Sequence, residues 1–470
     1  MALLFSGAVF TETNAQILES STPSIDKAFK IATETLYKNV KDNLIKAGGR
    51  YGGEWTRDIA INAWNASNLL IPEVTRNSLW SVTTDNHSYI GHQFWDQIIW
   101  VTGAYDHYLA TQDLDFLKQA YKTSKNSMQK LEKEAFDAEY GMFTGPSVFN
   151  DGIAGYEAPV FDIKLVTSTV LKHPGAWKIK CLSTNCIYYN AYEILAKMSV
   201  LCDDKAATAT YLQKASTLRT NIRKYLLNEE KNALYYLIDQ NGDPHKFQEG
   251  LGLSFAILFN IVSNEEAAEI VDKAYVAPYG IPSIYPNFKR FSKEKPGRHN
   301  TMIWPFVNAF FADAALQAGR PDKFVFELES LTQLCKFSKD SFYELYDPYT
   351  GRITGGYQTW NDKGIVEWES FYDQTWSATG YIRMILKGIL GIEFTEQGLK
   401  IAPNSYLMKH IGFSAMKDLR YQQGKLQINK VGKGYSIREI RVNGMTAGKS
   451  EVVIAAPHSG VTTVDIVMGE

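Results

Sequence analysis

The chain has 470 residues, of which 45% are hydrophobic and 21% are charged, and its formal net charge is −2. A chain of this length can bury a large core and exceeds one ordinary domain, so we expect a large domain with a smaller one. The balanced charge leaves no basic stripe for nucleic acid and no polybasic segment for an anionic membrane, and it suits a neutral partner.

Three further features limit the class of protein. No apolar run reaches the roughly 18 residues that a bilayer-spanning helix needs, so we expect no membrane insertion. Residues 1–7 lack the basic flank and apolar length of a secretory leader, but a trimmed chain would look the same, so cytoplasmic and extracytoplasmic locations stay open. The four cysteines lack zinc-site spacing, although Cys181 and Cys186 could close a short disulfide loop in an exported protein.

Residues up to about 390 are predicted to form a long series of helices. Most segments carry apolar residues at i, i+3, i+4 and i+7. Residues 187–198 are apolar on nearly all sides, as expected of an inner helix, whereas 211–219 keep a polar face. This alternation predicts helical hairpins in two concentric layers. The predicted helices are 24–41, 57–70, 94–111, 114–136, 187–203, 206–226, 250–260, 264–274, 302–318, 321–337 and 374–389.

Beyond residue 390 the hydrophobic pattern changes to short runs with a period of two. Glycine, asparagine and proline separate these runs, which is typical of antiparallel strands and predicts a small C-terminal β-sandwich. We therefore expect an N-terminal extension at 1–22, a catalytic helical domain at 23–390 and a sandwich domain at 391–470. The predicted strands are 398–403, 425–430, 435–442 and 451–454.

The first group of candidate site residues follows a glycine-rich loop at 48–53. Trp55 precedes Arg57 and Asp58, which lie in the first turn of a predicted helix. An arginine beside an aspartate can bind two adjacent sugar hydroxyls, with the indole as a wall. The alternative for Asp58 is a plain capping role at the helix N-terminus. The glycines are not followed by the residues of a phosphate-binding loop.

The second candidate is Asp151, in an Asn-Asp-Gly sequence at 150–152. Such a sequence is also a common surface turn. The surrounding loop is too apolar for a solvated linker, and burial beside Phe149 and Tyr156 would raise the pKa of Asp151. A carboxyl group of that kind can donate a proton to a leaving glycosidic oxygen. Glu157 is the reserve candidate for this role.

Two predicted helices begin with a tryptophan. Trp304 is followed by proline, and Trp376 lies two residues after Gln374 among small residues. Indole rings stack on the apolar faces of pyranose rings, so these residues are candidates for substrate contact. For Trp304, a helix start with a buried indole is an equal alternative.

The most informative segment is the aromatic-rich loop at 341–351, which contains Glu344. A glutamate among aromatic side chains can activate water against an anomeric carbon, which makes Glu344 the first candidate for a catalytic base. A surface turn that happens to be aromatic is the alternative. Glu367 and Glu369 compete for the same role because they also precede the helix that contains Trp376.

These segments together resemble the six-hairpin (α/α)6 glycosidases, most closely glycoside hydrolase family 63, with similarity to the trehalase and glucoamylase families. The resemblance covers roughly residues 40–390. It is carried by Phe-Tyr-Glu-x-Tyr-Asp-Pro-x-Thr-Gly at 342–351 and by Trp-x-Arg-Asp at 55–58. It implies that Glu344 is the base and that Asp151 contributes the acid, although the full acid motif of family 63 is not present around Asp151.

The resulting prediction is an inverting exo-glycosidase that hydrolyses an α-glucosidic or related α-glycosidic bond of a disaccharide or oligosaccharide. Asp151 would protonate the leaving oxygen while Glu344 deprotonates a water on the opposite face, so the carboxyl groups should lie roughly 6.5–9.5 Å apart. Arg57 and Asp58 would bind the nonreducing-end sugar, and no cofactor is required. The alternatives are a disaccharide phosphorylase of the same architecture and a non-catalytic carbohydrate-binding toroid.

Overall fold

The computed structural model describes residues 16–228, 233–359 and 364–469. Most of the predicted N-terminal extension, including the segment considered as a leader, lies outside the described residues. Within the described residues, no helix combines the length and the apolar character that a membrane crossing requires.

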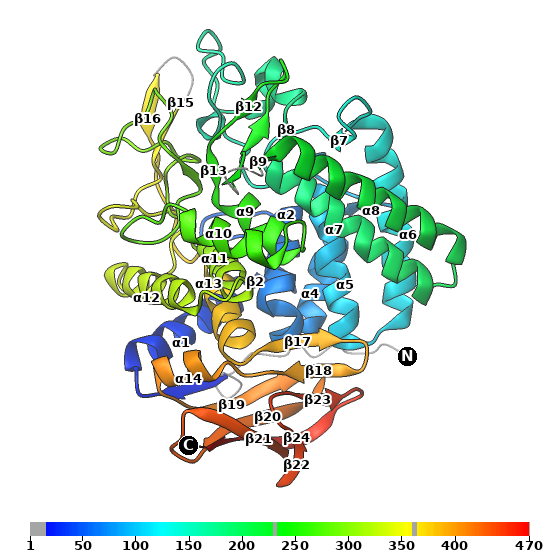
Figure 1. The fold of residues 1–470 in the computed structure, drawn as a ribbon, viewed down its shortest axis with the longest axis vertical. Helices are drawn as coiled ribbons and strands as arrows, with labels where there is room; N and C mark the ends of the chain where they lie inside the picture. Colours follow the sequence, from blue (N-terminus) through cyan, green and yellow to red (C-terminus); the bar gives the residue numbers. More distant parts are fainter. Residues whose placement is uncertain (1–15, 229–232, 360–363, 470) are drawn as a thin grey trace.

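Helices form a closed double ring in the larger part of the molecule (Figure 1). Along the inner ring each helix contacts the next, and the last packs against the first. Nearly every residue of these inner helices is buried because neighbouring helices cover both of their sides. Within the described residues the inner helices are α2 (Thr56–Asn62), α5 (Trp100–Thr111), α7 (Leu182–Leu201), α9 (Gly250–Leu258), α11 (Pro305–Gln317) and α13 (Thr375–Arg383).

The outer helices cover the inner ring and keep one polar face. For example, the helix at Leu114–Glu134 buries Phe116, Leu117 and Leu131 and exposes lysines on its other side. The outer helices of the described residues are α1 (Pro23–Lys38), α4 (Pro72–Ser81), α6 (Leu114–Glu134), α8 (Lys205–Leu226), α10 (Asn264–Lys273) and α12 (Pro321–Phe337). Six inner and six outer helices among the described residues make an (α/α)6 toroid, which confirms the predicted fold class.

One helix of the toroid was not predicted. The buried residues of α4 are Pro72, Val74, Thr75, Ser78 and Leu79. Two of these five residues are hydroxyl-bearing, so the apolar periodicity is weak. Two inner helices also continue as π-helical segments, η2 (Ala63–Ser67), which leads into α3 (Asn68–Leu70), and η8 (Met384–Ile389).

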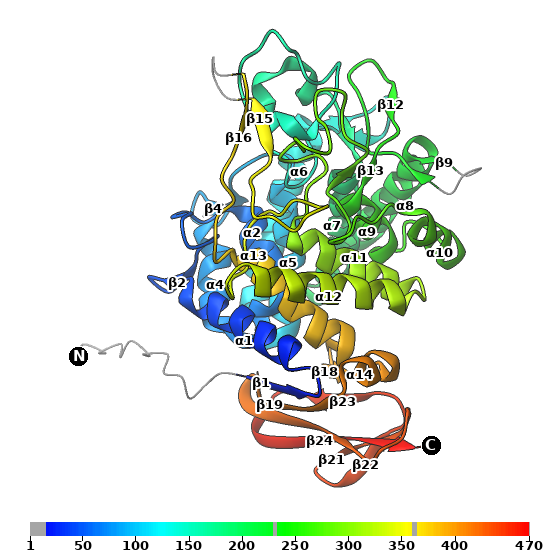
Figure 2. The same cartoon turned by 90° about the vertical axis from the view of Figure 1, so that its left-hand side faces the viewer.

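The C-terminal part is rich in strands and lies below the toroid (Figures 1 and 2). A three-stranded sheet has the order β17-β18-β23, and a six-stranded sheet has the order β1-β19-β20-β24-β21-β22. All pairs are antiparallel except β20 and β24, which are parallel. The strands are β1 (Ile17–Ser20), β17 (Ile392–Thr395), β18 (Gly398–Ile401), β19 (Phe413–Tyr421), β20 (Gln423–Val431), β21 (Ser436–Val442), β22 (Met445–Gly448), β23 (Val452–Ala455) and β24 (Ser459–Gly469), with α14 (Ser405–Ile411) between β18 and β19.

The N-terminal strand β1 belongs to this C-terminal sheet. It pairs with β19, from Ile17 opposite Lys417 to Ser20 opposite Phe413. The hydrophobic pattern did not predict this contact because its two strands lie at opposite ends of the chain. The division into an extension, a toroid and a sandwich domain stays a prediction.

Long loops gather at the end of the toroid where the inner helices begin, away from the C-terminal sheets (Figure 1). Short strand pairs stiffen them, including β8 (Lys180–Cys181) with β11 (Leu237–Ile238) and β15 (Tyr357–Thr359) with β16 (Ile365–Glu367). The loops before α7, α11 and α13 carry most of the polar residues that the sequence nominated. The loop end of the toroid therefore holds the side chains from which a site can be built.

Candidate active site

A cavity of about 330 Å³ opens at the loop end of the toroid. Every residue that the sequence nominated as first choice for catalysis or substrate binding lines it. These residues come from five separate parts of the chain, which the ring of inner helices brings together. They are Trp55, Arg57, Asp58, Asp151, Trp304, Glu344, Gln374 and Trp376.

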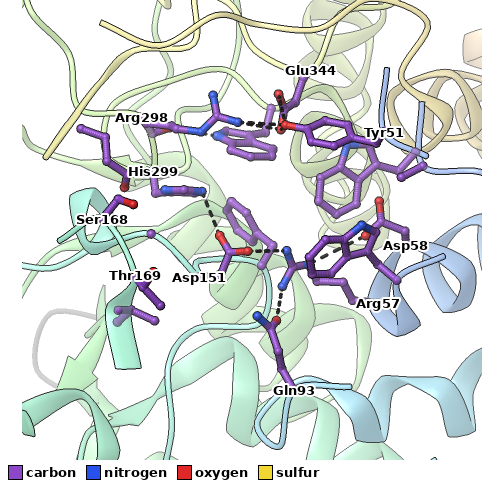
Figure 3. Close-up of a pocket in the computed structure, with 18 of the residues that line it drawn as sticks. Tyr51, Arg57, Asp58, Gln93, Asp151, Ser168, Thr169, Arg298, His299 and Glu344 are labelled. Atoms are coloured by element: carbon purple, nitrogen blue, oxygen red, sulfur yellow. Dashed lines mark hydrogen bonds and ion pairs between the residues drawn. The ribbon is translucent and has the colours of Figure 1, made fainter. Parts of the chain in front are cut away.

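Arg57 is the centre of a charged network on one side of the cavity (Figure 3). Its Nη1 donates to Gln93 Oε1 at 2.6 Å and to Asp96 Oδ2 at 2.9 Å. Its Nη2 donates to Asp151 Oδ2 at 3.0 Å. The guanidinium is buried and lies 5.6 Å from the ring centroid of Trp55. One arginine therefore links the first turn of α2 to two other loops.

Asp58 does not cap its helix. The N-cap residue of α2 is Trp55, which makes no side-chain cap hydrogen bond, and the Thr56 N–H donates to His92 Nδ1 at 3.0 Å. The Asp58 carboxylate lies 3.9 Å from Arg57 Nε and accepts no hydrogen bond from the described residues. Burial raises the pKa of Asp58 to about 7, against the lowering effect of Arg57. The Asp58 carboxylate lines the cavity and can accept a hydrogen bond from a ligand.

Asp151 lies at the other end of the Arg57 network, and its side chain is 35% exposed, toward the cavity. The expectation of a raised pKa is wrong in this arrangement. Burial raises the pKa of Asp151, but Arg57 and then His299, whose Nε2 lies 3.7 Å away, outweigh it and lower the pKa below its usual value. Tyr156 contacts the Asn150 carbonyl rather than Asp151.

Gly152, which follows Asp151, is required for steric reasons. A Cβ at Gly152 would lie 2.3 Å from Gln358 Oε1 and 2.4 Å from His299 Cε1. Only glycine therefore lets the loop that carries Asp151 approach the loop that carries His299 so closely.

Glu344 enters the cavity from a different side (Figure 3). Its side chain is only 5% exposed. Arg298 Nη2 donates to Glu344 Oε1 at 2.9 Å, and the Tyr51 hydroxyl lies 3.3 Å from both carboxylate oxygens. The Glu344 N–H donates to the Phe371 carbonyl at 2.9 Å, which fixes the loop. The carboxylate is thus held by a cation and a phenol.

The aromatic residues divide into an exposed wall and a buried floor. Trp55 is 37% exposed and stands at the rim. Trp304 and Trp376 are buried, and Trp376 stacks on Phe306 with ring centroids 4.3 Å apart. The buried-indole interpretation of Trp304 therefore describes its packing, although one edge of the ring still lines the cavity.

Several polar atoms of lining residues are buried without a hydrogen-bond partner among the described residues. They are Arg57 Nε, His299 Nδ1, Gln374 Oε1 and Trp376 Nε1. Each unpaired buried polar group costs about 1–3 kcal/mol. A ligand with several hydroxyl groups could satisfy such donors and acceptors together.

Four important lining residues were not nominated from the sequence: Tyr51, Gln93, Arg298 and His299. Asp96, which was not nominated either, lies outside the lining and accepts a hydrogen bond from Arg57. A usable signal existed for some of them. Trp95-Asp96 and Arg298-His299 both lie shortly before inner helices, as Trp55 does. Burial lowers the pKa of His299 to about 3, so this imidazole is neutral at physiological pH.

The competing carboxylates have other partners and do not line this cavity within the described residues. Glu157 accepts from the Lys289 N–H at 2.8 Å. Glu367 accepts from Thr354 and pairs with Arg352, and Glu369 pairs with Arg50 on the surface. Cys181 and Cys186 are free and buried, so the suggested disulfide is not formed.

The cavity therefore presents three carboxylates, those of Asp58 and Asp151 on one side and that of Glu344 on another, together with two arginines and an aromatic floor. Charged acceptors and donors of this kind bind sugar hydroxyls, while aromatic rings cover the apolar faces of a pyranose. No group of His, Cys, Asp and Glu among the described residues is arranged to hold a metal ion. Carboxyl groups in such a cavity can take part in acid–base chemistry.

Solved structures with a similar fold include several glycosidases. A glycoside hydrolase family 63 mannosylglycerate hydrolase from Thermus thermophilus is 14% identical, with a TM-score of 0.58 over 75% of this chain and 99% of that chain. A rhamnosidase from Klebsiella oxytoca is 13% identical, with a TM-score of 0.58 over 80% and 66%. A family 78 rhamnosidase from Bacillus sp. GL1 is 12% identical, with a TM-score of 0.61 over 97% and 44%. At these identities the likeness is one of fold.

Comparison of the sequence with known families identifies the family of this chain. No curated protein matches it. Residues 70–377 match the model of the mannosylglycerate hydrolase MGH1-like glycoside hydrolase domain. This range includes Asp151 and Glu344 and begins after Trp55, Arg57 and Asp58. It confirms the predicted resemblance to the family 63 glycosidases. The chain belongs to the mannosylglycerate hydrolase MGH1-like family of glycoside hydrolases.

Proposed function

We propose that this glycoside hydrolase releases a terminal sugar from an α-glucosidic or related α-glycosidic bond with inversion of configuration. Asp151 is the general acid and Glu344 the general base. The observation that carries the proposal is that these two carboxylates, from separate loops, line one cavity, each beside a different arginine. Glycosidases use a pair of carboxyl groups in this way, and inversion further requires that a water fits between the base and the anomeric carbon.

The shape of the cavity supports exo cleavage. Buried side chains of Phe149, Trp304 and Trp376 close its inner end, and the inner helices continue behind them as packed core. A sugar that enters from the loop end therefore meets a floor. Arg57 and Asp58 lie beside this floor, where they can bind hydroxyls of the terminal unit.

Whether the general acid, Asp151, carries a proton depends on Arg57. With Arg57 donating to Asp151, the pKa of Asp151 is lowered and the group is ionised near neutral pH. A sugar hydroxyl that accepts from Arg57, and that excludes water from Asp151, weakens this effect and raises the pKa of the carboxyl. Binding of substrate thus prepares Asp151 to carry the proton that the leaving oxygen needs.

Phosphorolysis suits the cavity less well. A phosphate in the place of the attacking water would lie against the carboxylate of Glu344, and the nearest guanidinium, Arg298, already donates to that carboxylate. A non-catalytic toroid does not need two carboxylates on separate sides of one cavity. Hydrolysis is therefore the reaction that these charges favour.

A product screen tests the proposal. The purified protein is incubated with a panel of α-linked disaccharides and with mannosylglycerate, which is included because the Thermus thermophilus structure carries that name. Each reaction is run with and without inorganic phosphate, and beside the Glu344→Gln protein. We expect a free monosaccharide from at least one α-linked substrate, without phosphate, and none from Glu344→Gln. A sugar phosphate as product would contradict the proposal.

A further inference from the structure

A second and larger cavity, of about 570 Å³, lies at the opposite end of the toroid. Its walls come mostly from the later turns of the inner helices α5, α7 and α11, together with the strands β17 and β18 of the C-terminal part. Figure 1 shows β17 and β18 crossing below the helices, away from the loop end. The volume falls within the range of about 300–1,000 Å³ that is typical of small-molecule sites.

Both π-helical segments of the inner ring adjoin this cavity. Trp64 lies in η2 and Lys387 in η8, and both side chains line the wall. π-Helical turns are rare and occur often at functional sites, because they displace side chains from the positions that a regular helix would give them. The proposed glycosidase reaction uses neither segment.

An aromatic surface forms one side of the second cavity. Trp64 is partly exposed and stacks on Phe259, with ring centroids 5.9 Å apart and an interplanar angle of 22°. The guanidinium of Arg383 covers Trp64 at 4.6 Å from its ring centroid. The part of the indole that remains exposed, beside charged groups, can contact the apolar face of a sugar ring.

Apart from Lys197, the charged groups that line the cavity occur as ion pairs. Arg383 Nε donates to Asp313 Oδ2 at 2.6 Å, and Lys387 Nζ lies 3.6 Å from Asp106 Oδ1. The side chain of Asp313 is 10% exposed, and its Oδ1 is buried with no hydrogen-bond partner among the described residues. The lining contains nearly equal numbers of cationic and anionic side chains: Lys197, Arg383, Lys387 and Lys400 against Asp106, Asp313 and Glu393.

We propose that this cavity binds a small neutral polyhydroxylated molecule, such as a monosaccharide. A hydroxyl group can donate to a carboxylate and accept from an ammonium group, so it fits paired charges of both signs without breaking them. An anion of similar size would have to lie close to three carboxylates. The proposal does not depend on the reaction proposed for the other cavity, because the two cavities share no lining residue.

Crystal soaking and titration with D-glucose test this site. We expect electron density for the sugar against Trp64 in wild-type crystals. The cavity at the loop end, which contains Asp58, is called the active cavity. In solution, Asp58→Ala is expected to weaken sugar binding there, so titration of this protein with D-glucose should report the second cavity. A double variant that combines Asp58→Ala with Asn190→Trp places an indole in the second cavity from α7. This change should weaken the glucose binding that remains in the Asp58→Ala protein at least tenfold. Adding Lys205→Ala, on the exposed start of α8, should leave it unchanged.

Four outcomes would overturn the inference. They are density for glucose only at the loop end, no binding to the Asp58→Ala protein, equal affinity with and without Asn190→Trp, and displacement of the sugar by equimolar inorganic phosphate. The soak uses wild-type protein, so it decides the question even if Asn190→Trp fails to fold. A protein that binds glucose beside Trp64 but hydrolyses no substrate would contradict the proposed function and keep this inference.

Discussion

The two sides of the active cavity hold their carboxylates in different ways. On the Asp151 side one guanidinium, that of Arg57, lies within 4 Å of three carboxylates, those of Asp58, Asp96 and Asp151. On the Glu344 side one arginine, Arg298, pairs with a single carboxylate. The first side has more acids than its one cation can neutralise, and the second is balanced.

This difference suits different tasks. Where several acids share one cation at low solvent exposure, their ionisation is coupled and protons are retained near neutral pH. Burial accordingly raises the pKa of both Asp58 and Asp96 to about 7. A carboxylate with its own arginine, as Glu344 has in Arg298, is held in one position. The Asp151 side is thus suited to supply a proton, and the Glu344 side to accept one.

The largest expected effect comes from the balanced side. Glu344→Gln should lower kcat by about 10²–10⁴-fold, because an amide keeps the shape of the side chain but cannot accept a proton. Steady-state kinetics on the best substrate of the product screen measures the loss. Glu369→Gln is the matched control, since Glu369 is exposed and pairs with Arg50. A similar loss in both variants would contradict the assignment of the base.

The next effect concerns binding of the terminal sugar on the Asp151 side. Asp58→Ala should lower kcat/KM by an amount equivalent to about 2–3 kcal/mol, because a charged hydrogen bond to the substrate is lost. Asp322→Ala, in the first turn of the outer helix α12, is the control for a mere effect on helix stability. Normal kinetics and a lowered Tm for Asp58→Ala would identify a structural role.

Asp96 should act through Arg57 rather than on the substrate. Asp96→Asn removes one of the acids that share this guanidinium, so Arg57 should stabilise ionised Asp151 more strongly. We expect the alkaline limb of the pH profile of kcat to move to lower pH by about one unit or less. An unchanged profile with a reduced Tm would show that Asp96 only supports the fold.

The last effect is on stability in acid rather than on activity. Burial lowers the pKa of His299 to about 3, below its value of 6.5 in an unfolded chain. The unfolded chain therefore binds the proton first as the pH falls, so the contribution of His299 to stability is lost between about pH 6.5 and 3, by at most about 1.4 kcal/mol per pH unit. Denaturant unfolding of wild type and His299→Gln over this range measures the slope. Equal slopes would contradict the expected role of this imidazole.

The sequence predicted the fold well because helical periodicity is a local signal. Within the part of the chain that the structure describes, eleven of the twelve helices of the toroid follow from it, and α4 does not, because two of its five buried residues are hydroxyl-bearing. The sequence also nominated residues that come together at one cavity, since aromatic and charged residues near the starts of inner helices are unusual. The strand pairing of β1 with β19 joins the two ends of the chain and has no local signal.

The electrostatics of the site could not be predicted in the same way. The pKa of Asp151 depends on Arg57, which is 94 positions away in the sequence, and on His299 in another loop. The local neighbours Phe149 and Tyr156 pointed to a raised pKa, and the contact with Arg57 reverses it. Charge pairs formed by tertiary structure decide such values, and the spacing of residues does not contain them.

The proposed joint action of Asp151 and Glu344 on one water and one glycosidic bond would fix the anomer that leaves the active cavity first. Proton NMR of the first-formed sugar, recorded before mutarotation, identifies this anomer. We expect an α-linked substrate to release the β-anomer first, as is usual for carboxyl groups roughly 6.5–9.5 Å apart. Release of the α-anomer first would contradict inversion by this pair, because retention requires a nucleophile near 5 Å from the acid instead of a base that activates water.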